Sequence, residues 1–242
     1  IWSWPEATKV NEIEMPDRRS VGGFVVPSND RVYVLGQDAS QIKIYEADLV
    51  NDAVTSLSFN FESGMYSGLQ AVSVGDEIKI IGSWQAAHQP AEVVAIDLAT
   101  GTHEQLTEFT ADRVAGLDLQ PVEHFWFENS DGMQIHNLLV RPANFDASKK
   151  YPVVALMHGG PHSMWRDYFF IRWNYHLLAR EDFVLILTNY RGSTGFGENF
   201  AQAIQGDPLR GPGNDINEAV DTAIERYPFI DGERQCAAGA SY

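Results

Sequence analysis

Three short apolar runs in the second half of the chain constrain its fold most strongly. They cover residues 151–157, 183–187 and 236–238. None of them alternates between polar and apolar residues, which is typical of strands buried on both faces. Helical patterns separate the runs, at residues 164–180 and 215–227. Strands that alternate with helices predict a mostly parallel sheet with helices packed over it.

Residues 215–227 carry the clearest helix pattern in the chain. One helical face collects the apolar residues Ile216, Ala219, Val220, Ala223, Ile224 and Tyr227. Asp215 and Glu218 have the spacing of a capping box, so we expect the helix to begin at Asp215. Pro228 is expected to end it.

The last apolar run contains the only cysteine, Cys236. A single thiol cannot form a disulfide within the chain, so cysteine usage leaves the cellular compartment open. The small apolar neighbours of Cys236 predict a buried strand in which the thiol acts as a small hydrophobic group.

The first half of the chain follows a different pattern. From about residue 20 to residue 120, short apolar or alternating segments are separated by clusters of Gly, Asn, Asp and Ser. Residues 41–45 and 77–80 alternate with period two, and Thr100-Gly101 marks a hairpin turn. This all-β pattern suits a sandwich, a barrel or propeller blades, and no internal repeat selects among the three.

A change of pattern near residues 119–123 predicts the domain boundary. Immediately after it, residues 122–127 and 133–140 read as two antiparallel strands joined by a turn around Asn129-Ser130-Asp131-Gly132. We therefore expect one domain over residues 1–120 and a second over residues 121–242.

Composition narrows the function classes. The formal net charge of −16 disfavours nucleic-acid partners, because an acidic surface repels phosphates. We interpret this charge mainly as a solvated surface, with attraction of a cationic peptide terminus as the alternative.

No apolar run is long enough to span a membrane. The sequence contains no zinc, phosphate-loop or dinucleotide motif, so no cofactor is predicted, and the histidines are interpreted as surface or satisfied core residues.

The segment Gly239-Ala240-Ser241-Tyr242 follows the third apolar run directly. It matches the first four positions of the G-x-S-x-G nucleophile elbow, in which a serine sits on a sharp turn between a strand and a helix. Glycine at the first position allows backbones to approach closely. Ser241 is therefore the candidate nucleophile, with an ordinary turn serine as the alternative.

A second motif, His158-Gly159-Gly160-Pro161, follows the first apolar run. Hydrolases of the α/β fold carry an oxyanion loop at this place, where a backbone N–H points at an oxygen that becomes negatively charged. Gly159 and Gly160 allow such a loop to curl. The second N–H donor is expected to come from Tyr242, the residue after the candidate nucleophile.

The loop over residues 189–197, Asn-Tyr-Arg-Gly-Ser-Thr-Gly-Phe-Gly, follows the second apolar run. A loop at the carboxyl end of a parallel strand lies beside the active-site crevice of such sheets. Arg191 in this loop either orients the substrate or forms a structural ion pair with a carboxylate. We favour the ion pair and keep Arg191 as a candidate substrate-binding residue.

The order and spacing of these three motifs resemble those of the prolyl oligopeptidase family, and in particular its acylaminoacyl-peptidase and dipeptidyl-peptidase-like branch. The resemblance is specific over residues 122–242. It implies that residues 1–120 form the C-terminal blades of a β-propeller, and that residues 121–242 form the N-terminal part of an α/β-hydrolase domain ending at the elbow. Residues 212–214 depart from the tryptophan-glycine pattern of the family.

The resemblance implies a serine peptidase that acts on short peptides through an acyl-enzyme, without a cofactor. Ser241 matches the nucleophile, and the N–H groups of Gly160 and Tyr242 match the oxyanion donors. The catalytic Asp and His of the family lie downstream of the elbow. We therefore expect this chain alone to be inactive and poorly stable unless the C-terminal segment, or a second copy in a homo-oligomer, completes its sheet.

Two alternatives remain open from the sequence. A carboxylesterase or lipase typically has His-Gly-Gly-Gly in place of His158-Gly159-Gly160-Pro161 and lacks a large all-β half. A non-catalytic binding module would combine a propeller with a degenerate hydrolase half. The sequence does not determine the cleavage preference, the compartment or the oligomeric state.

Overall fold

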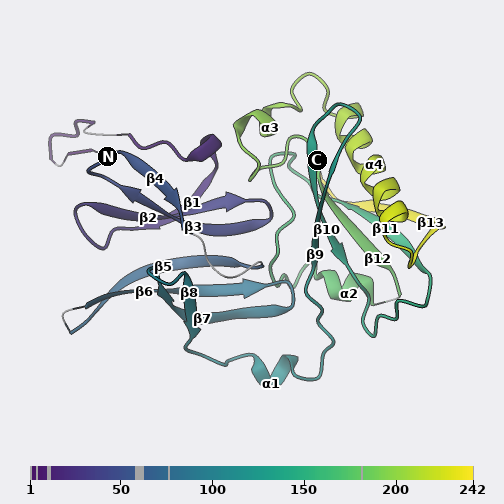
Figure 1. Ribbon diagram of the computed structural model, residues 1–242, viewed down its shortest axis with the longest axis horizontal. Helices are drawn as coiled ribbons and strands as arrows, with labels where there is room; N and C mark the ends of the chain where they lie inside the picture. The colour runs from purple at the N-terminus through teal and green to yellow at the C-terminus, as the bar shows by residue number, and fades with distance from the viewer. Residues whose placement is uncertain are drawn as a thin grey trace.

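The computed structural model describes residues 2–241 apart from residues 4, 10, 11, 58–62, 76 and 181. Its strands form two sheets, one from each half of the chain. Figure 1 shows the two sheets side by side, with the N-terminal sheet on the left and the helices gathered around the other sheet. The described chain is mostly β structure with few helices.

The N-terminal sheet consists of two antiparallel meanders. Its strands are β1 (Val21–Val25), β2 (Arg31–Asp38), β3 (Gln41–Asp48), β4 (Ala53–Ser56), β5 (Met65–Val74), β6 (Glu77–Ala86), β7 (Gln89–Asp97) and β8 (Thr102–Gln105). The first meander runs β1-β2-β3-β4 and the second runs β5-β6-β7-β8, with every pairing inside each meander antiparallel. The parallel pair Ile42–Met65 joins β3 to β5.

Period-two patterning builds this sheet as predicted. In β3, for example, Ile42 and Ile44 are both buried in the core of the sheet. The predicted hairpin turn at Thr100-Gly101 is confirmed, because β7 and β8 pair antiparallel on either side of it. Gly101 adopts a φ of +66°, a conformation that glycine enters without steric cost. The Asp97 carboxylate accepts hydrogen bonds from the N–H groups of Ala99 and Thr100 and so closes the turn.

The C-terminal sheet has the order β13-β11-β12-β10-β9. Its strands are β9 (Glu123–Glu128), β10 (Gln134–Val140), β11 (Tyr151–Met157), β12 (Val184–Asn189) and β13 (Ile230–Gly239). The antiparallel pairing of β9 with β10 is confirmed, and β11 is parallel to both β12 and β13. However, β10 also pairs antiparallel with β12, so the sheet is mixed and not mostly parallel as predicted.

Outside the sheets, the short helices η1 (Pro16–Arg18), α1 (Ala111–Val114), α2 (Tyr175–Ala179) and α3 (Glu198–Gln202) are accompanied by one longer helix, α4 (Arg210–Arg226). The predicted helix within residues 164–180 is α2. The long helix α4 packs Ala219, Val220 and Ala223 into the core of the C-terminal sheet. No described helix is long and apolar enough to cross a membrane.

Helix α4 begins five residues earlier than predicted. The carboxylate of Asp207 accepts hydrogen bonds from the N–H groups of Arg210 and Gly211, which are among the unpaired donors of the first turn. Pro212 fits within this turn, because its missing N–H has no partner to lose there. Asp215 therefore lies inside the helix, and its predicted capping role is wrong.

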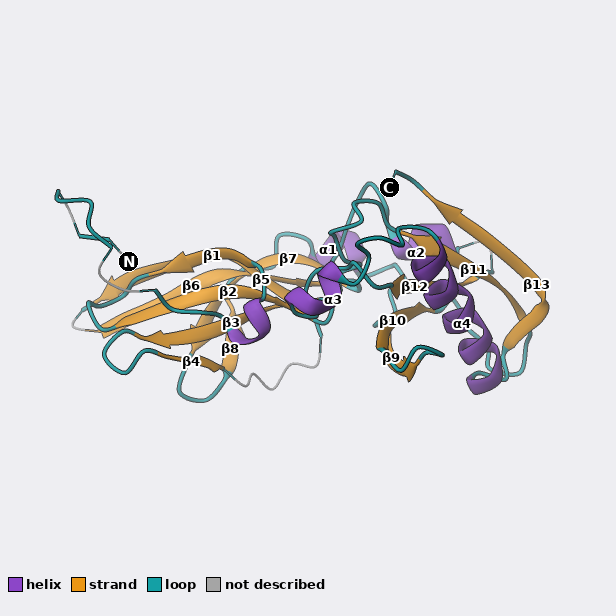
Figure 2. Cartoon of the chain, turned by 90° about the horizontal axis from the view of Figure 1, so that it is seen from above, coloured by secondary structure: helices purple, strands orange, loops and turns teal. Residues whose placement is uncertain are grey.

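The expectation that Cys236 is buried is also wrong. β13 lies at the edge of its sheet (Figure 2). Cys236 is exposed. The apolar run correctly indicated a strand parallel to β11, as the pairing of Val154 with Cys236 shows. Burial of that strand depends on what lies against it, and residues 233–241 are exposed in this structure.

Polar contacts join the two halves of the molecule. The buried carboxylate of Asp167, in the segment after β11, accepts hydrogen bonds from the N–H groups of Gly64 and Ala87 in the N-terminal half. The turn between β2 and β3 reaches the loop after β12, where Ala39 donates its N–H to the carbonyl of Gly195. The second meander and the first therefore both contact the segments that follow the C-terminal strands.

Candidate active site

Ser241 lies on a strained turn at the carboxyl end of β13. Its φ is +64°, a left-handed conformation that a residue with a Cβ seldom adopts. Gly239, just before the turn, lies so close to β11 that a Cβ there would come within 2.9 Å of the Met157 side chain. The backbone conformation at Ser241 and the close approach at Gly239 are both features of a nucleophile elbow.

The loop over residues 158–161 follows β11 and lies against Ser241. A Cβ on Gly159 would come within 2.8 Å of the Ser241 Cβ and 3.2 Å of its Oγ, so a side chain larger than hydrogen does not fit there. Gly160 has a φ of +138°, and a Cβ on it would lie 2.8 Å from the N atom of His162. The parallel pairing of β11 and β13 brings these two loops together at one edge of the sheet. Tyr242, the other expected N–H donor, lies outside the described residues.

A pocket of about 310 Å³ opens beside Ser241. Its walls come from the ends of β11 and β13, the start of the loop after β12, and the first turns of α4: Met157, His158, Tyr190, Pro208, Leu209, Pro212, Gly213, Ile216, Gly239, Ala240 and Ser241. Apolar side chains and backbone dominate this lining, so the pocket suits an apolar side chain of a bound ligand.

His158 is the imidazole that lines this pocket, and both of its ring nitrogens have partners. Nδ1 lies 2.9 Å from the carbonyl oxygen of Gly159, and Nε2 lies 3.0 Å from the Oγ of Ser193. Burial lowers the pKa of His158 to about 4, against a smaller opposing effect of the Gly159 carbonyl, so the ring is neutral at pH 7. His158 is thus a structural member of the site and not a free base for Ser241.

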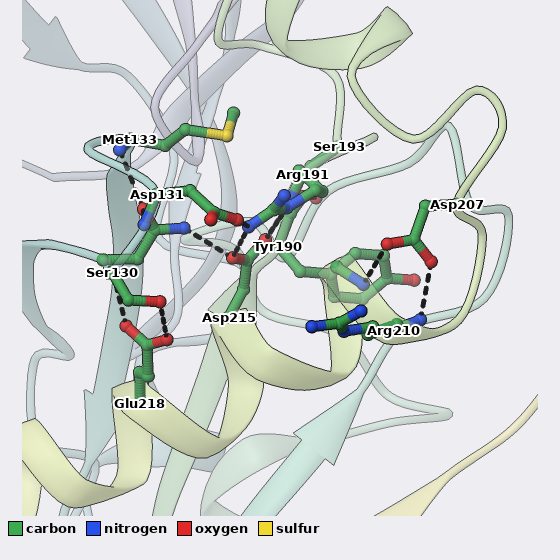
Figure 3. A network of polar contacts seen from close by, with 12 residues as sticks. Ser130, Asp131, Met133, Tyr190, Arg191, Ser193, Asp207, Arg210, Asp215 and Glu218 are labelled. Carbon is green, nitrogen blue, oxygen red and sulfur yellow. Dashed lines mark hydrogen bonds and ion pairs between the residues drawn. The ribbon is translucent and has the colours of Figure 1, made fainter.

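Arg191 forms the ion pair that the sequence favoured, and its partner is Asp215 of α4 (Figure 3). The fully buried Asp215 carboxylate accepts from Arg191 Nε at 2.9 Å, from Nη2 at 2.7 Å and from the backbone N–H of Arg191 at 2.9 Å. Hydrogen bonding to Asp215, opposed by burial, raises the pKa of the guanidinium further above its ordinary value. A substrate-orienting role for Arg191 stays a prediction.

The same network ties α4 to the turn between β9 and β10, as Figure 3 shows. Asn129 donates to Asp215, and Asp131 accepts from Arg191 Nη2. Glu218, predicted to cap the helix, instead accepts from the N–H and hydroxyl of Ser130. Sequence reasoning identified this segment only as a turn, because nothing in its local pattern shows that a helix more than 80 residues later supplies its partners.

The interface between the two halves contains a pair of histidines, of which His136 is buried and His124 is half-buried. His136 is fully buried, with Nε2 3.0 Å from Nδ1 of His124 and Nδ1 3.1 Å from Nδ2 of Asn189. Ser40, from the N-terminal half, accepts a hydrogen bond from the same Asn189 amide. His136 is therefore a satisfied core histidine, as expected. Across the residues that the structure describes, no group of three His, Cys, Asp or Glu side chains could hold a metal ion.

Residues 168–242, which include the loop after β12, helix α4, β13 and Ser241, match the family model described as "Prolyl oligopeptidase family". Over these residues the chain is similar to the prolyl oligopeptidase family, as its motifs indicated. Proteins similar to this chain include peptidases of the dipeptidyl and acylaminoacyl types, which is the branch that the motifs indicated.

Two curated proteins and one solved structure are described as examples of these similarities. The chain is 26% identical to dipeptidyl-peptidase 4 of Giardia intestinalis over 251 aligned residues, covering 93% of this chain and 32% of that protein. It is 39% identical to dipeptidyl-peptidase 5 of Schizosaccharomyces pombe over 127 residues, covering 52% of this chain and 19% of the relative. The solved acylaminoacyl peptidase of Pyrococcus horikoshii has the same fold over 91% of this chain and 33% of its own, with a TM-score of 0.76 and 24% identity.

The three matched proteins are much longer than this chain, which spans at most about a third of each of them. One further solved acylaminoacyl peptidase with the same fold contains Z-Gly-Gly-Phe-chloromethyl ketone, a peptide-based compound. The likeness to the solved structures establishes the fold of the matched part.

Proposed function

We propose that the protein is a serine peptidase and that Ser241 is its nucleophile. The observation that carries this proposal is the left-handed φ of Ser241 at the carboxyl end of β13, where its Oγ faces the side-chain-free Gly159. In the proposed reaction, Ser241 Oγ attacks the carbonyl carbon of a scissile amide and forms an acyl-enzyme, which water then hydrolyses. The N–H groups of Gly160 and Tyr242 stabilise the negative oxygen of the intermediate.

The general base of this reaction is proposed to lie in a segment that follows residue 242, together with the Asp that orients it. Two observations support this placement. The imidazole that lines the Ser241 pocket, His158, has both nitrogens occupied by Gly159 and Ser193. The family relatives are also about three or more times the length of this chain. Residues 1–242 alone are accordingly expected to be inactive, because a serine hydroxyl without its base is a weak nucleophile.

The proposed substrates are short peptides, from which the enzyme releases an acylated amino acid or a dipeptide. The mostly apolar pocket beside Ser241 supports an apolar side chain next to the scissile bond.

We further propose that residues 1–120 are propeller blades that limit access to a hydrolase domain that begins at residue 121. The two four-stranded antiparallel meanders of the N-terminal half, joined by the Ile42–Met65 pair, support two such blades. The proposed mechanism requires no cofactor.

The test is fluorophosphonate labelling of the full-length protein that contains this sequence, beside the variants Ser241→Ala and Ser73→Ala. Ser73 is an exposed serine of β5 and is the matched control. Labelling and turnover of acyl-amino-acid and dipeptidyl amides should vanish in Ser241→Ala, by on the order of 10⁶-fold in kcat, and persist in Ser73→Ala.

Other outcomes of this experiment would support a different function. Turnover of esters with none of amides would favour a carboxylesterase. A folded full-length protein that neither labels nor turns over any substrate would contradict the proposal and favour a non-catalytic binding module.

A further inference from the structure

Tyr190, in the loop after β12, is the largest fully buried side chain among the described residues. Its hydroxyl donates a hydrogen bond to the carbonyl oxygen of His158 at 2.6 Å. Its ring stacks on the His158 imidazole, with the ring centres 4.4 Å apart and the planes 15° from parallel. Tyr190 thus holds both the backbone and the side chain of His158.

Ser193, three residues later, completes this contact. It is fully buried, and its Oγ lies 2.6 Å from the carbonyl oxygen of Tyr190 and 3.0 Å from His158 Nε2. The far end of the oxyanion loop is held by the same segment, because His162 Nδ1 lies 3.0 Å from the carbonyl oxygen of Gly192. Residues 190–193 therefore contact the loop over residues 158–162 at both of its ends.

Gly159 and Gly160 lie between those two anchored ends. Glycine has the largest backbone freedom of any residue, so neither can set the direction of its own N–H group. A side chain on Gly159 would collide with Ser241, so no larger residue at this position can restrict the backbone. The direction of the loop must come from its neighbours, and His158 is the neighbour that Tyr190 and Ser193 hold.

We propose that Tyr190 and Ser193 are positioning residues for the oxyanion site, which act by holding His158 and through it the Gly159–Gly160 backbone against Ser241. This inference rests on the proposed peptidase function. An oxyanion donor stabilises the charge that develops in the transition state and contributes little to binding of the uncharged substrate carbonyl. Loss of the positioning contact therefore lowers kcat and leaves KM nearly unchanged.

The chain offers a matched control for this test. Tyr175 of α2 is also buried, at 2% exposure, and its hydroxyl also donates to a backbone carbonyl, that of Arg166 at 2.8 Å. Tyr175 does not line the Ser241 pocket. The variants Tyr190→Phe and Tyr175→Phe thus each remove one buried hydroxyl from a carbonyl partner, and only the first does so at the candidate site.

The experiment measures kcat and KM on a peptide amide, inhibition by a peptide aldehyde and thermal unfolding in the full-length protein. Tyr190→Phe should lower kcat by about tenfold with KM within twofold, since small misplacements of catalytic groups cost one to two orders of magnitude. The aldehyde, which mimics the tetrahedral intermediate, should bind more weakly by a similar factor. Tyr175→Phe should change the unfolding temperature as much as Tyr190→Phe does, and it should leave kcat unchanged. Ser193→Ala provides a second variant with the same expected kinetic pattern.

Two results would overturn the positioning role. Unchanged kcat in both Tyr190→Phe and Ser193→Ala would mean that the loop holds its direction without them. An equal loss of kcat in Tyr175→Phe would mean that the effect is general destabilisation. If the wild-type protein labels with fluorophosphonate and turns over peptides, either result counts against the positioning role alone. If the wild type does neither, the proposed function is wrong, and the positioning role that rests on it is wrong as well.

Discussion

The two halves of the molecule bury polar side chains very differently. Among the described residues, the N-terminal half buries three polar or charged side chains, Ser40, Gln41 and Glu92. The C-terminal half buries ten: Asn129, His136, Asn137, His158, Asp167, His176, Thr188, Asn189, Ser193 and Asp215. Burial of a polar group lowers stability unless it finds a partner, so such groups persist where their geometry matters. Apolar packing therefore builds the N-terminal half, whereas the C-terminal half also buries polar groups, among them His158 in the lining of the Ser241 pocket.

The largest expected effect on stability lies in the buried ion pair of the C-terminal half. Asp215→Ala leaves the Arg191 guanidinium without its main partner, so we expect a loss of about 3–5 kcal/mol in the free energy of unfolding, measured by urea denaturation. Asp131→Ala is the control, because Asp131 is exposed and contacts the same guanidinium. Its loss should stay below about 1 kcal/mol. Equal losses in the two variants would contradict the claim that the buried partner of Arg191 stabilises the protein more than the exposed one.

The next effect is the pH dependence of the C-terminal half. Burial lowers the pKa of His158 from 6.5 to about 4, so the unfolded chain binds a proton in this window that the folded protein does not. Stability should therefore fall as the pH drops from 6.5 to 4, by on the order of 3 kcal/mol for this group. The pKa of His136 is lowered well below 6.5 as well, by burial and then by the charge of His124. Urea denaturation from pH 7 to pH 4 should show a weaker slope in His158→Gln, and an unchanged slope would contradict this account.

A smaller effect concerns Glu92, the buried carboxylate of the N-terminal half. It accepts hydrogen bonds from the hydroxyl of Thr107, the N–H of Phe109, and both the hydroxyl and the N–H of Thr110. Although burial raises its pKa, these hydrogen bonds lower it to about 2. Glu92→Gln should lower the free energy of unfolding by about 1–3 kcal/mol at pH 7.

The folded pKa of Glu92 is depressed, so its contribution is present above pH 4.5 and should disappear as the pH falls from 4.5 to about 2. This window lies below that of His158, so the contributions of Glu92 and His158 should disappear in separate pH ranges. A difference between wild type and Glu92→Gln that stays constant down to pH 2 would contradict the assignment.

The smallest effect is expected at the surface of the N-terminal sheet. Arg31 is 43% exposed and pairs with Glu46 across β2 and β3. Because solvent screens such a pair, Arg31→Ala should change the free energy of unfolding by less than about 1 kcal/mol in chemical denaturation. A loss above about 2 kcal/mol would contradict the view that apolar packing, and not polar contacts, stabilises the N-terminal sheet.

Much of the candidate site was predictable because its parts are local. The elbow before Ser241 and the Gly159-Gly160 loop each depend on residues adjacent in sequence and on the strand that precedes them. The start of α4 was not predictable in the same way. Asp207 and Asp215 are both plausible caps, and the choice between them depends on the partners of Asp215, which lie on the loop after β12 and on the turn between β9 and β10.

Local sequence accounts for the strands, their turns and the motifs that follow them, because apolar periodicity and glycine placement act over a few residues. Tertiary structure alone decided which groups meet: Arg191 with Asp215, Tyr190 with His158, and Ser40 with Asn189. It also decided that β13 is an edge strand with Cys236 exposed. The physical reason is that a local pattern reports how one element is built, whereas the partners of a buried polar group and the cover of a sheet edge come from segments far away in the chain.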